Sequence, residues 1–314
     1  MHGPDAFADH VRRGLTESPK RLSSKYFYDA HGSRLFEQIC VQPEYYLTRT
    51  ELAIMREHAS DIAATLGPDV LLIEYGSGSG IKTRLLLEHL QRPTAYVPVE
   101  IARDALAVSV AALHVALPTL EILPVCADFT QCFPLVQPLR RARRRVVYFP
   151  GSTIGNFDDA GALVLLRKMH AEMESGGGAL IGVDLKKDPA IIEAAYNDAA
   201  GITAQFTLNL LTRLNRELGA DFNLAAFRHR AKYNATAGRI ETCLVSTREQ
   251  RVHVAGTTAH FAAGEAMRVE LSCKYALEDF ARLAAQAGLR VVQVWTDAQR
   301  LFSIQYLVRD TDLA

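Results

Sequence analysis

The sequence contains no apolar segment long enough to span a bilayer. Residues 1–20 carry scattered charges and lack an apolar core, so they do not match a secretory signal peptide. Net charge is absent too, because 35 acidic residues balance 35 lysines and arginines. That balance argues against nonspecific electrostatic binding to nucleic acid. We therefore expect a cytoplasmic protein that binds neither membranes nor nucleic acids.

The cysteines do not suggest a disulfide framework. They are five in number, with no C-x-x-C pair, and lie at Cys40, Cys126, Cys132, Cys243 and Cys273. This usage is typical of buried or free thiols in a reducing compartment. The ten histidines show neither an H-x-x-x-H spacing nor a cluster with cysteine. We therefore predict no metal site.

The composition is that of an ordinary globular protein. Of the 314 residues, 49% are hydrophobic and 22% are charged. This length suits one large α/β domain or two smaller domains. The sequence shows no internal repeat and no low-complexity tract.

A glycine-rich stretch is the motif around which the rest of the sequence is interpreted. The apolar run 70–75 includes Glu74 and is followed by Gly76, Gly78 and Gly80, after which a helical pattern begins. This order predicts a buried strand, a tight turn and a helix start whose exposed N–H groups favour electron-rich ligand atoms. The spacing fits neither the dinucleotide fingerprint nor a P-loop. It resembles the E-x-G-x-G-x-G form of S-adenosylmethionine-dependent methyltransferases.

Strand-like and helix-like segments alternate around this stretch. Strands are expected at 70–75, 95–100, 121–126, 145–150 and 179–184, with helices at 81–90, 103–116 and 158–174. Such alternation predicts a parallel sheet whose functional residues lie at the carboxyl ends of the strands. The candidates at those ends are Glu74, Glu100, Asp128, Gly151–Asn156 and Asp184.

Two of these acids have the positions of nucleoside ligands. Glu100 follows the glycine turn by about 20 residues, where an acid that accepts from ribose hydroxyls is expected. Asp128 follows the next strand and is placed to accept from an adenine amino group. The arginine run 140–145 allows a nucleic-acid patch, but no aromatic residues interleave it, which favours a solvated connection.

The segments outside this region predict a cap and an inserted lobe. Helices are expected at 5–15, after a Ser33 cap, and from Thr48 or Thr50 to Ile62. Residues 186–275 interrupt the strand–helix rhythm with a long helix from Pro189 that continues through 201–218, and with strands at 240–245 and 267–272. An insertion of this length predicts a substrate lid or second lobe. A helix at 276–287 and an antiparallel strand pair, 289–295 and 301–308, complete the chain.

Several further motifs carry a more specific resemblance. They are Lys25–Asp29, Pro43–Tyr46, Glu74–Gly78, Phe149–Phe157, Tyr196–Asp198, Asn215–Leu218 and Glu270–Lys274. In this order the chain resembles the histidine Nα-methyltransferases of ergothioneine biosynthesis. The resemblance implies a Rossmann-like α/β sheet from 61–188 and 274–314, an N-terminal helical cap at 1–60, and an inserted α+β substrate lobe at 189–273 with contributions from 20–50.

The resemblance also implies a role for each site residue. S-adenosylmethionine, with S-adenosylhomocysteine as product, would contact Glu74, Gly76, Ser77, Gly78, Lys82, Glu100, Asp128 and Phe129. The amino-acid substrate would contact Tyr45, Gly151, Asn156, Tyr196, Thr242, Glu270 and Ser272. Asn156 and Tyr196 would hold its carboxylate, while Glu270 and Ser272 would bind the imidazole with help from Tyr45. Tyr28 would flank the amine, and the catalytic set is Tyr28, Tyr45, Asn156 and Tyr196.

Two positions depart from the family pattern and leave alternatives open. The family usually has aspartate where this chain has Glu100, and commonly methionine where it has Thr242. A wider or more polar pocket at Thr242 would admit another free amino acid, such as tryptophan or tyrosine. A nucleic-acid or protein methyltransferase and a non-catalytic binding module are the alternatives from other classes. We expect a monomer that acts on a small molecule.

Overall fold

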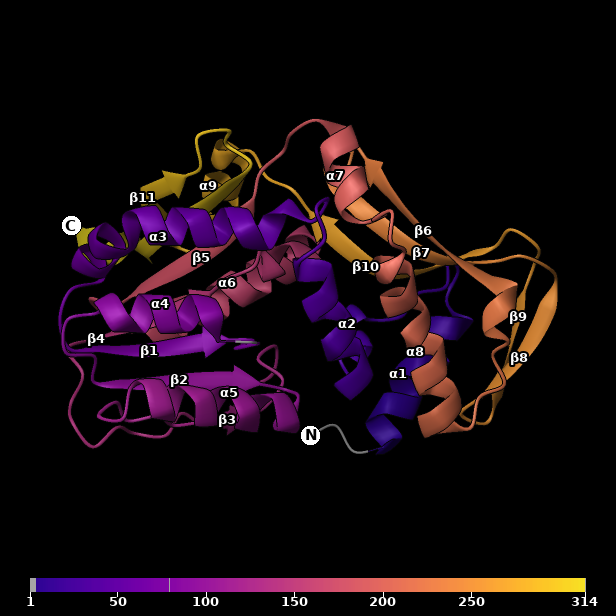
Figure 1. Ribbon diagram of the computed structural model, residues 1–314, viewed down its shortest axis with the longest axis horizontal. Helices are drawn as coiled ribbons and strands as arrows, with labels where there is room; N and C mark the ends of the chain where they lie inside the picture. The colour runs from indigo at the N-terminus through magenta and orange to yellow at the C-terminus, as the bar shows by residue number, and fades with distance from the viewer. Residues whose placement is uncertain (1–3, 79, 314) are drawn as a thin grey trace. The chain divides into compact units, whose positions relative to one another are not determined.

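The computed structural model describes residues 4–78 and 80–313, and the chain forms two compact units (Figure 1). The sheet unit comprises Leu47–Lys186 and the chain from Lys274 on. The second unit comprises the described residues up to Tyr46 together with Lys187–Cys273. The segment 1–60, expected as one cap, is therefore divided between the two units at Tyr46.

The sheet unit is built on seven strands in the order β11-β12-β5-β4-β1-β2-β3. These are β1 (Val70–Tyr75), β2 (Ala95–Glu100), β3 (Val125–Cys126), β4 (Arg144–Phe149), β5 (Gly178–Asp184), β11 (Leu289–Thr296) and β12 (Phe302–Arg309). All neighbouring strands pair in parallel except β12, which runs antiparallel to both β5 and β11. Strand β1 is buried along its whole length, as its apolar run requires. The predicted α/β sheet and its antiparallel strand pair are confirmed.

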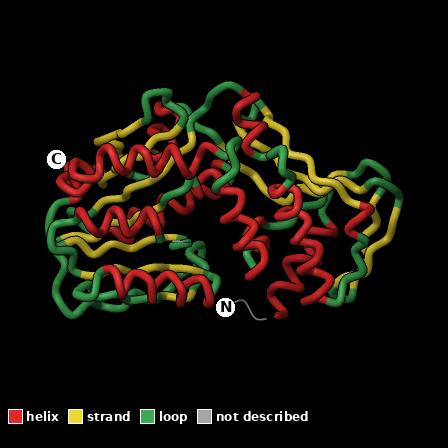
Figure 2. The backbone as a smooth tube through the Cα atoms, in the orientation of Figure 1, coloured by secondary structure: helices red, strands yellow, loops and turns green. Residues whose placement is uncertain are grey.

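Helices pack on this sheet, as Figure 2 shows by its colours. They are α3 (Tyr46–Leu66), α4 (Ile81–His89), α5 (Arg103–Ala116), α6 (Asp159–Met173) and α9 (Leu277–Ala285), with short 3₁₀ turns η2 (Thr153–Asn156) and η4 (Asp310–Leu313). Helix α5 packs on β2, α6 on β4 and β5, and α9 on β11. Asp158 caps α6 by accepting from the Gly161 amide at 2.9 Å.

Three element boundaries differ from the predictions. Strand β3 has two residues instead of the expected 121–126, because Pro124 has no N–H to donate and Ile122 forms only an isolated bridge. Helix α2 (Ala30–Cys40) begins at Asp29, whose carboxylate accepts from the Gly32 amide at 2.7 Å, so Ser33 is not its cap. Helix α3 begins at Tyr46, before either predicted threonine cap.

The second unit combines helices with two small antiparallel sheets. Its helices are α1 (Pro4–Thr16), η1 (Ser24–Phe27), α2, α7 (Pro189–Ala195), α8 (Ile202–Leu218) and η3 (Leu224–Ala226). One sheet has the order β10-β7-β6, from Ala266–Cys273, Arg239–Ser246 and Phe227–Asn234; the other pairs β8 (Gln250–Val254) with β9 (Thr257–Phe261). This arrangement is the α+β content that the resemblance implied for the insertion.

The expected long helix after Pro189 is split in two. Helix α7 ends at Ala195, and α8 starts after Gly201, whose φ of 69° is left-handed. The Asp198 carboxylate accepts from the amides of Ile202 and Thr203 at 2.7 and 2.8 Å and so supplies a new helix start. Apolar residues at helical spacing in the second segment did not reveal this break.

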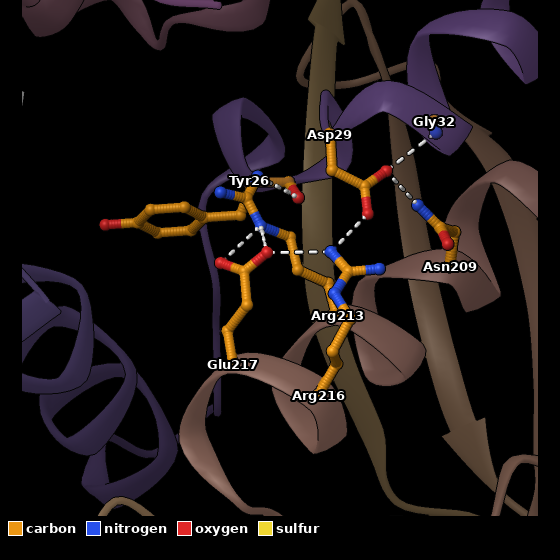
Figure 3. A network of polar contacts seen from close by, with 7 residues as sticks. All are labelled: Tyr26, Asp29, Gly32, Asn209, Arg213, Arg216 and Glu217. Carbon is orange, nitrogen blue, oxygen red and sulfur yellow. Dashed lines mark hydrogen bonds and ion pairs between the residues drawn. The ribbon is translucent and has the colours of Figure 1, made fainter.

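A polar network joins α2 to α8 (Figure 3). Besides capping α2, Asp29 accepts from Asn209 at 2.8 Å and from Arg216 at 2.7 Å. Burial raises the pKa of Asp29, but the hydrogen bonds from Gly32 and Arg216 outweigh it and hold that pKa below its usual value. The motifs 25–29 and 215–218 therefore meet in a junction that fixes the backbone next to Tyr28.

Several features of the described residues bear on membrane, metal and nucleic-acid binding. None of the described helices is both long and apolar enough to cross a membrane. The part of the chain that the structure describes contains no group of three or more histidine, cysteine or acidic side chains placed to hold a metal ion. In the arginine run, Arg140 donates to the Pro93 carbonyl at 2.9 Å and Arg145 pairs with Glu174 at 2.6 Å. These two arginines thus have structural partners inside the sheet unit.

Candidate active site

The turn after β1 has the backbone that only glycine adopts easily. Gly76, Gly78 and Gly80 have φ values of 76°, 48° and 71°. Between them Ser77 is only 5% exposed, and its hydroxyl has no hydrogen-bond partner among the described residues. A buried polar atom without a partner is costly. This hydroxyl therefore fits a turn that receives a polar ligand such as S-adenosylmethionine.

Glu74 lies at the end of β1, but its carboxylate is engaged inside the sheet unit. It accepts from the Thr83 hydroxyl at 2.8 Å and from the Tyr96 hydroxyl. Burial raises the pKa of Glu74 to about 8, although both hydroxyl donors lower it. Glu74 therefore ties α4 and β2 to β1, directly before the glycine turn.

The other predicted cofactor residues follow the neighbouring strands β2 and β3. A Glu100 oxygen accepts from the Ala102 amide at 3.0 Å. An Asp128 oxygen accepts from the amide and hydroxyl of Thr130 at 3.0 and 2.6 Å. Both acids are half-buried. Because these strands are adjacent and parallel to β1, the predicted acids gather at one edge of the sheet.

Phe129 extends this edge over the glycine turn. Its ring stacks on Tyr75 with centroids 5.5 Å apart and planes 8° from parallel. A Cβ added at Gly76 would come within 3.8 Å of the Phe129 ring. The half-buried Phe129 therefore forms an apolar wall beside the turn, and its contact with the cofactor stays a prediction.

Lys82 leads to a site residue that the sequence analysis missed. Its ammonium lies 2.6 Å from the carboxylate of Glu51 in α3, which is 1% exposed. The same carboxylate accepts from the Gly151 amide at 2.9 and 3.0 Å. A signal for Glu51 is present in the sequence, since it lies among Leu47, Ile54 and Met55 on the buried stripe of its helix. An acid on such a stripe must have a specific partner.

The loop after β4 carries Gly151 and Asn156. Gly151 and Ser152 both have left-handed backbone, with φ values of 76° and 56°. The Ser152 hydroxyl accepts from the Asp184 amide at 2.9 Å, so the loop is fixed to the end of β5. Asn156 is the last residue of η2 and is half-buried. The predicted carboxylate-binding residue therefore lies on a turn held at both of its first two residues.

The second unit brings three of the predicted substrate residues together. The Tyr196 hydroxyl donates to the Ser272 hydroxyl at 2.7 Å, and both side chains are buried. The Tyr45 ring meets the Tyr196 ring edge-on, with centroids 6.4 Å apart. Burial raises the pKa of Tyr45, and the neighbouring Tyr196, Tyr28 and Glu270 raise it further. The Tyr45 phenol therefore remains protonated and can donate a hydrogen bond.

Thr242 and Glu270 face each other across β7 and β10. They are register partners, and the Thr242 hydroxyl donates to one Glu270 carboxylate oxygen at 3.1 Å. Thr242 is fully buried, whereas Glu270 is half-buried. The pairing shifts register between Arg268 and Glu270, which redirects the side chains of β10. Alternation along the strand could therefore not reveal which face Glu270 lies on.

Tyr28 belongs to an aromatic group in the same unit. Its ring meets Phe36 and Phe206 edge-on, with centroids 5.6 and 5.4 Å apart. The ring is half-buried, so part of its surface remains open. Tyr28 thus contributes to the packing of η1, α2 and α8, and its proposed contact with the amine stays a prediction.

The predicted site residues fall into two groups, each gathered within one unit. The cofactor residues, Gly151 and Asn156 lie at the carboxyl edge of the seven-stranded sheet. The other group consists of Tyr28, Tyr45, Tyr196, Thr242, Glu270 and Ser272. The first group can hold a nucleoside and an amino-acid moiety, and the second offers phenol, hydroxyl and carboxylate groups to a small polar ligand.

The sequence is similar to those of several known proteins. A family model described as histidine-specific methyltransferase, SAM-dependent, matches residues 7–309. The histidine N-alpha-methyltransferase of Mycolicibacterium smegmatis is 42% identical, covering 97% of this chain and 95% of its own. The Mycobacterium tuberculosis protein of the same name is 39% identical, over 91% and 90%. Ergothioneine biosynthesis protein 1 of Neurospora crassa is 31% identical over 89% of this chain and 32% of its own.

Proposed function

Since the chain belongs to the family of histidine-specific, S-adenosylmethionine-dependent methyltransferases, we propose that it methylates the α-amino nitrogen of free L-histidine three times. The product is the trimethylated betaine hercynine, and the reaction is the first step of ergothioneine biosynthesis. The observation that carries this proposal is the Thr242–Glu270 hydrogen bond. It holds a carboxylate acceptor in the unit that also contains the Tyr196–Ser272 pair.

Binding of the methyl donor is assigned to the edge of the seven-stranded sheet. Bound S-adenosylmethionine supplies an electrophilic methyl group on a sulfonium. Glu100 would accept from the ribose hydroxyls, and Asp128 would accept from the adenine amino group. Gly76, Ser77 and Gly78 would receive the polar groups at the turn, and Lys82 would donate to the cofactor from the first turn of α4.

We assign separate residues to the imidazole and to the carboxylate of histidine. Glu270 would accept a hydrogen bond from an imidazole N–H, and Thr242 restrains the carboxylate that does so. Asn156, on the Gly151 turn, and Tyr196 would donate to the substrate carboxylate. A site built around a hydrogen-bond acceptor discriminates against side chains without a donor, because the acceptor would be left unpaired. Tryptophan offers one N–H but a larger ring, so shape must reject it.

The enzyme would accelerate the reaction mainly by positioning the substrate amine against the methyl group. Methyl transfer is an in-line displacement that needs a neutral amine with its lone pair aimed at the methyl carbon, so orientation supplies much of the rate enhancement. The nitrogen becomes cationic as it is methylated. Tyr28 and Tyr45 would stabilise this charge through their ring faces and oxygen atoms. A protonated Tyr45 phenol could also donate to the imidazole.

Product analysis by mass spectrometry tests this function. The purified chain is incubated with S-adenosylmethionine and, in separate reactions, histidine, tryptophan, tyrosine or RNA. We expect three added methyl groups on histidine, with its monomethyl and dimethyl forms also accepted as substrates. Preference for tryptophan or tyrosine would overturn the substrate assignment, and methylation of RNA alone would overturn the enzyme class.

We further propose that the enzyme works as a monomer in the cytoplasm. The five cysteines are free, and each unit has its own buried core. Free thiols suit a reducing compartment. Sedimentation of the purified chain at micromolar concentration tests the oligomeric state, and a dimeric mass would overturn the first part. Fractionation of the producing cells tests the compartment.

A further inference from the structure

The buried Glu51 carboxylate is shared by helix α4 and the loop after β4, both in the sheet unit. Its partners are the Lys82 ammonium at 2.6 Å and the Gly151 amide at 2.9 and 3.0 Å. Lys82 lies in the first turn after the glycine loop. Gly151 opens the turn that leads to Asn156. One carboxylate therefore connects a proposed cofactor residue to the proposed substrate loop.

The packing around this carboxylate leaves it little freedom. A Cβ added at Gly182 in β5 would lie 2.4 Å from the Glu51 carboxylate and 3.1 Å from the Gly151 nitrogen. The side chain of Glu51 therefore lies directly against the backbone of β5. Only glycine at this strand position leaves room for it. The fold thus provides both the hydrogen-bond partners of Glu51 and the space for its side chain.

Burial makes the two partners of Glu51 dependent on each other. A carboxylate that is 1% exposed cannot exchange a lost partner for bulk water. Two donors that share one acceptor compete for it, and in surroundings of low dielectric this competition is strong. If a ligand draws Lys82 toward itself, the bond between Glu51 and Gly151 must adjust. A shift of the Gly151 turn would likewise be felt at Lys82.

We propose that Glu51 is a positioning residue that makes binding of the methyl donor and of the amino acid cooperative. This inference rests on the proposed function, which assigns Lys82 to the cofactor and the Gly151–Asn156 turn to the substrate carboxylate. Cofactor binding would set Lys82 and, through Glu51, the Gly151 turn. Coupling of this kind is reciprocal, so the amino acid would strengthen cofactor binding by the same factor.

Calorimetry on the full chain tests the coupling. The affinity for histidine is measured alone and with saturating S-adenosylhomocysteine. In the wild type we expect histidine to bind at least about fivefold more tightly with S-adenosylhomocysteine present, at the lower end of common coupling factors. In Glu51→Gln, which keeps the volume but leaves one oxygen for two donors, this factor should fall below about twofold.

A matched control separates coupling from general destabilisation. Glu174→Gln removes another ion pair of the sheet unit, with Arg145 at 2.6 Å, from an exposed position. This control should retain the wild-type coupling. If the role of Glu51 were purely structural, the Glu51→Gln variant would have a lower melting temperature but an unchanged ratio of the two histidine affinities. Full coupling in Glu51→Gln would overturn the inference.

A second variant covers the case in which Glu51→Gln does not fold. Glu51→Asp keeps the charge but is one methylene shorter, so it cannot reach both donors at once. Its coupling should also be reduced, and full coupling would again contradict the inference. A wild type that binds both ligands independently would contradict it too. A wild type that binds no histidine would instead count against the proposed function.

Discussion

Glu270 and Thr242 are the residue pair to which we assign the specificity of the proposed reaction. The Thr242 hydroxyl occupies one carboxylate oxygen of Glu270 and restricts the orientation of the other. A restrained acceptor loses less entropy when it binds an imidazole than a mobile one would. The threonine at this position therefore adds a hydrogen bond that supports the Glu270 carboxylate.

We predict that Glu270→Ala weakens histidine binding by about 10- to 100-fold, which is the loss of a hydrogen bond to a charged acceptor. The affinity for S-adenosylhomocysteine should remain unchanged. Thr242→Val, which keeps the shape, should weaken histidine binding by only about fivefold. Calorimetry with each ligand checks both variants. If histidine affinity is unchanged in Glu270→Ala, the imidazole assignment is wrong.

Glu74 gives a prediction about pH. Its pKa in the folded protein is raised to about 8 by burial, so the folded state binds a proton that the unfolded state releases above its ordinary pKa of 4.5. Its contribution to stability is therefore largest below that ordinary value and is lost as the pH rises towards about 8. The slope is at most about 1.4 kcal/mol per pH unit.

Glu74→Gln should remove this dependence, because the amide does not titrate. We expect the variant to gain stability over the wild type as the pH rises from about 5 to 9, in thermal melts across that range. Asp69, a half-buried acid paired with the exposed Arg92, provides the control as Asp69→Asn. A wild type and a Glu74→Gln variant with parallel pH profiles would contradict the buried, protonated state of Glu74.

At the level of elements, the junction of α2 and α8 explains two motifs that the sequence analysis could only recognise. Asp29 caps α2 and binds two residues of α8, Asn209 and Arg216. The capping prediction failed here because Ser33 and Asp29 are both good caps, and only the contact with α8 favours the earlier one. Tyr28 precedes Asp29 directly, so the junction also orients a proposed site residue.

We predict that Asp29→Ala destabilises the protein by about 2–3 kcal/mol, through loss of the cap and of the bonds to α8. Asp29→Asn retains an acceptor for the cap and should cost only about 1 kcal/mol. Urea unfolding followed by circular dichroism measures both. Equal losses in the two variants would show that the ion pair with Arg216, and not the cap, dominates.

At the scale of the whole molecule, the chain leaves and re-enters the sheet unit at neighbouring points. Lys186 is the last residue before the second unit and Lys274 the first after it. The Tyr275 amide donates to the Asp184 carbonyl at 3.1 Å, and the Lys186 amide donates to the Tyr275 carbonyl at 3.0 Å. Lys274 and Asp184 form a fully buried ion pair at 2.6 Å. The two points where the chain leaves and re-enters the sheet unit are thus held together.

Removing one partner of this buried pair leaves an uncompensated charge, so we predict that Lys274→Met costs about 3–5 kcal/mol. The double variant Asp184→Leu with Lys274→Met should lose much less, because no buried charge remains. Denaturant unfolding of both proteins provides the comparison. A double variant less stable than the single variant would show that the pair contributes more than its charges cost to bury.

The sequence by itself determined the sheet and its cofactor edge, because these depend on local signals. Apolar runs of strand length, glycines that require positive φ, and acids after successive strands are all visible in the sequence, and parallel pairing brings their ends together. The resemblance of the motifs added the amino-acid site. Pro124, which has no N–H to donate, shows how a local feature can still shorten a predicted strand.

Only the tertiary structure decided which side chains serve one another. Glu51 reaches Lys82 and Gly151 from a distant helix, Glu74 turns toward Thr83 and Tyr96, and a register shift sets the face of Glu270. Such partnerships depend on side chains that are far apart in sequence and close in space. A buried carboxylate must find its donors, but periodicity does not say which residues will supply them.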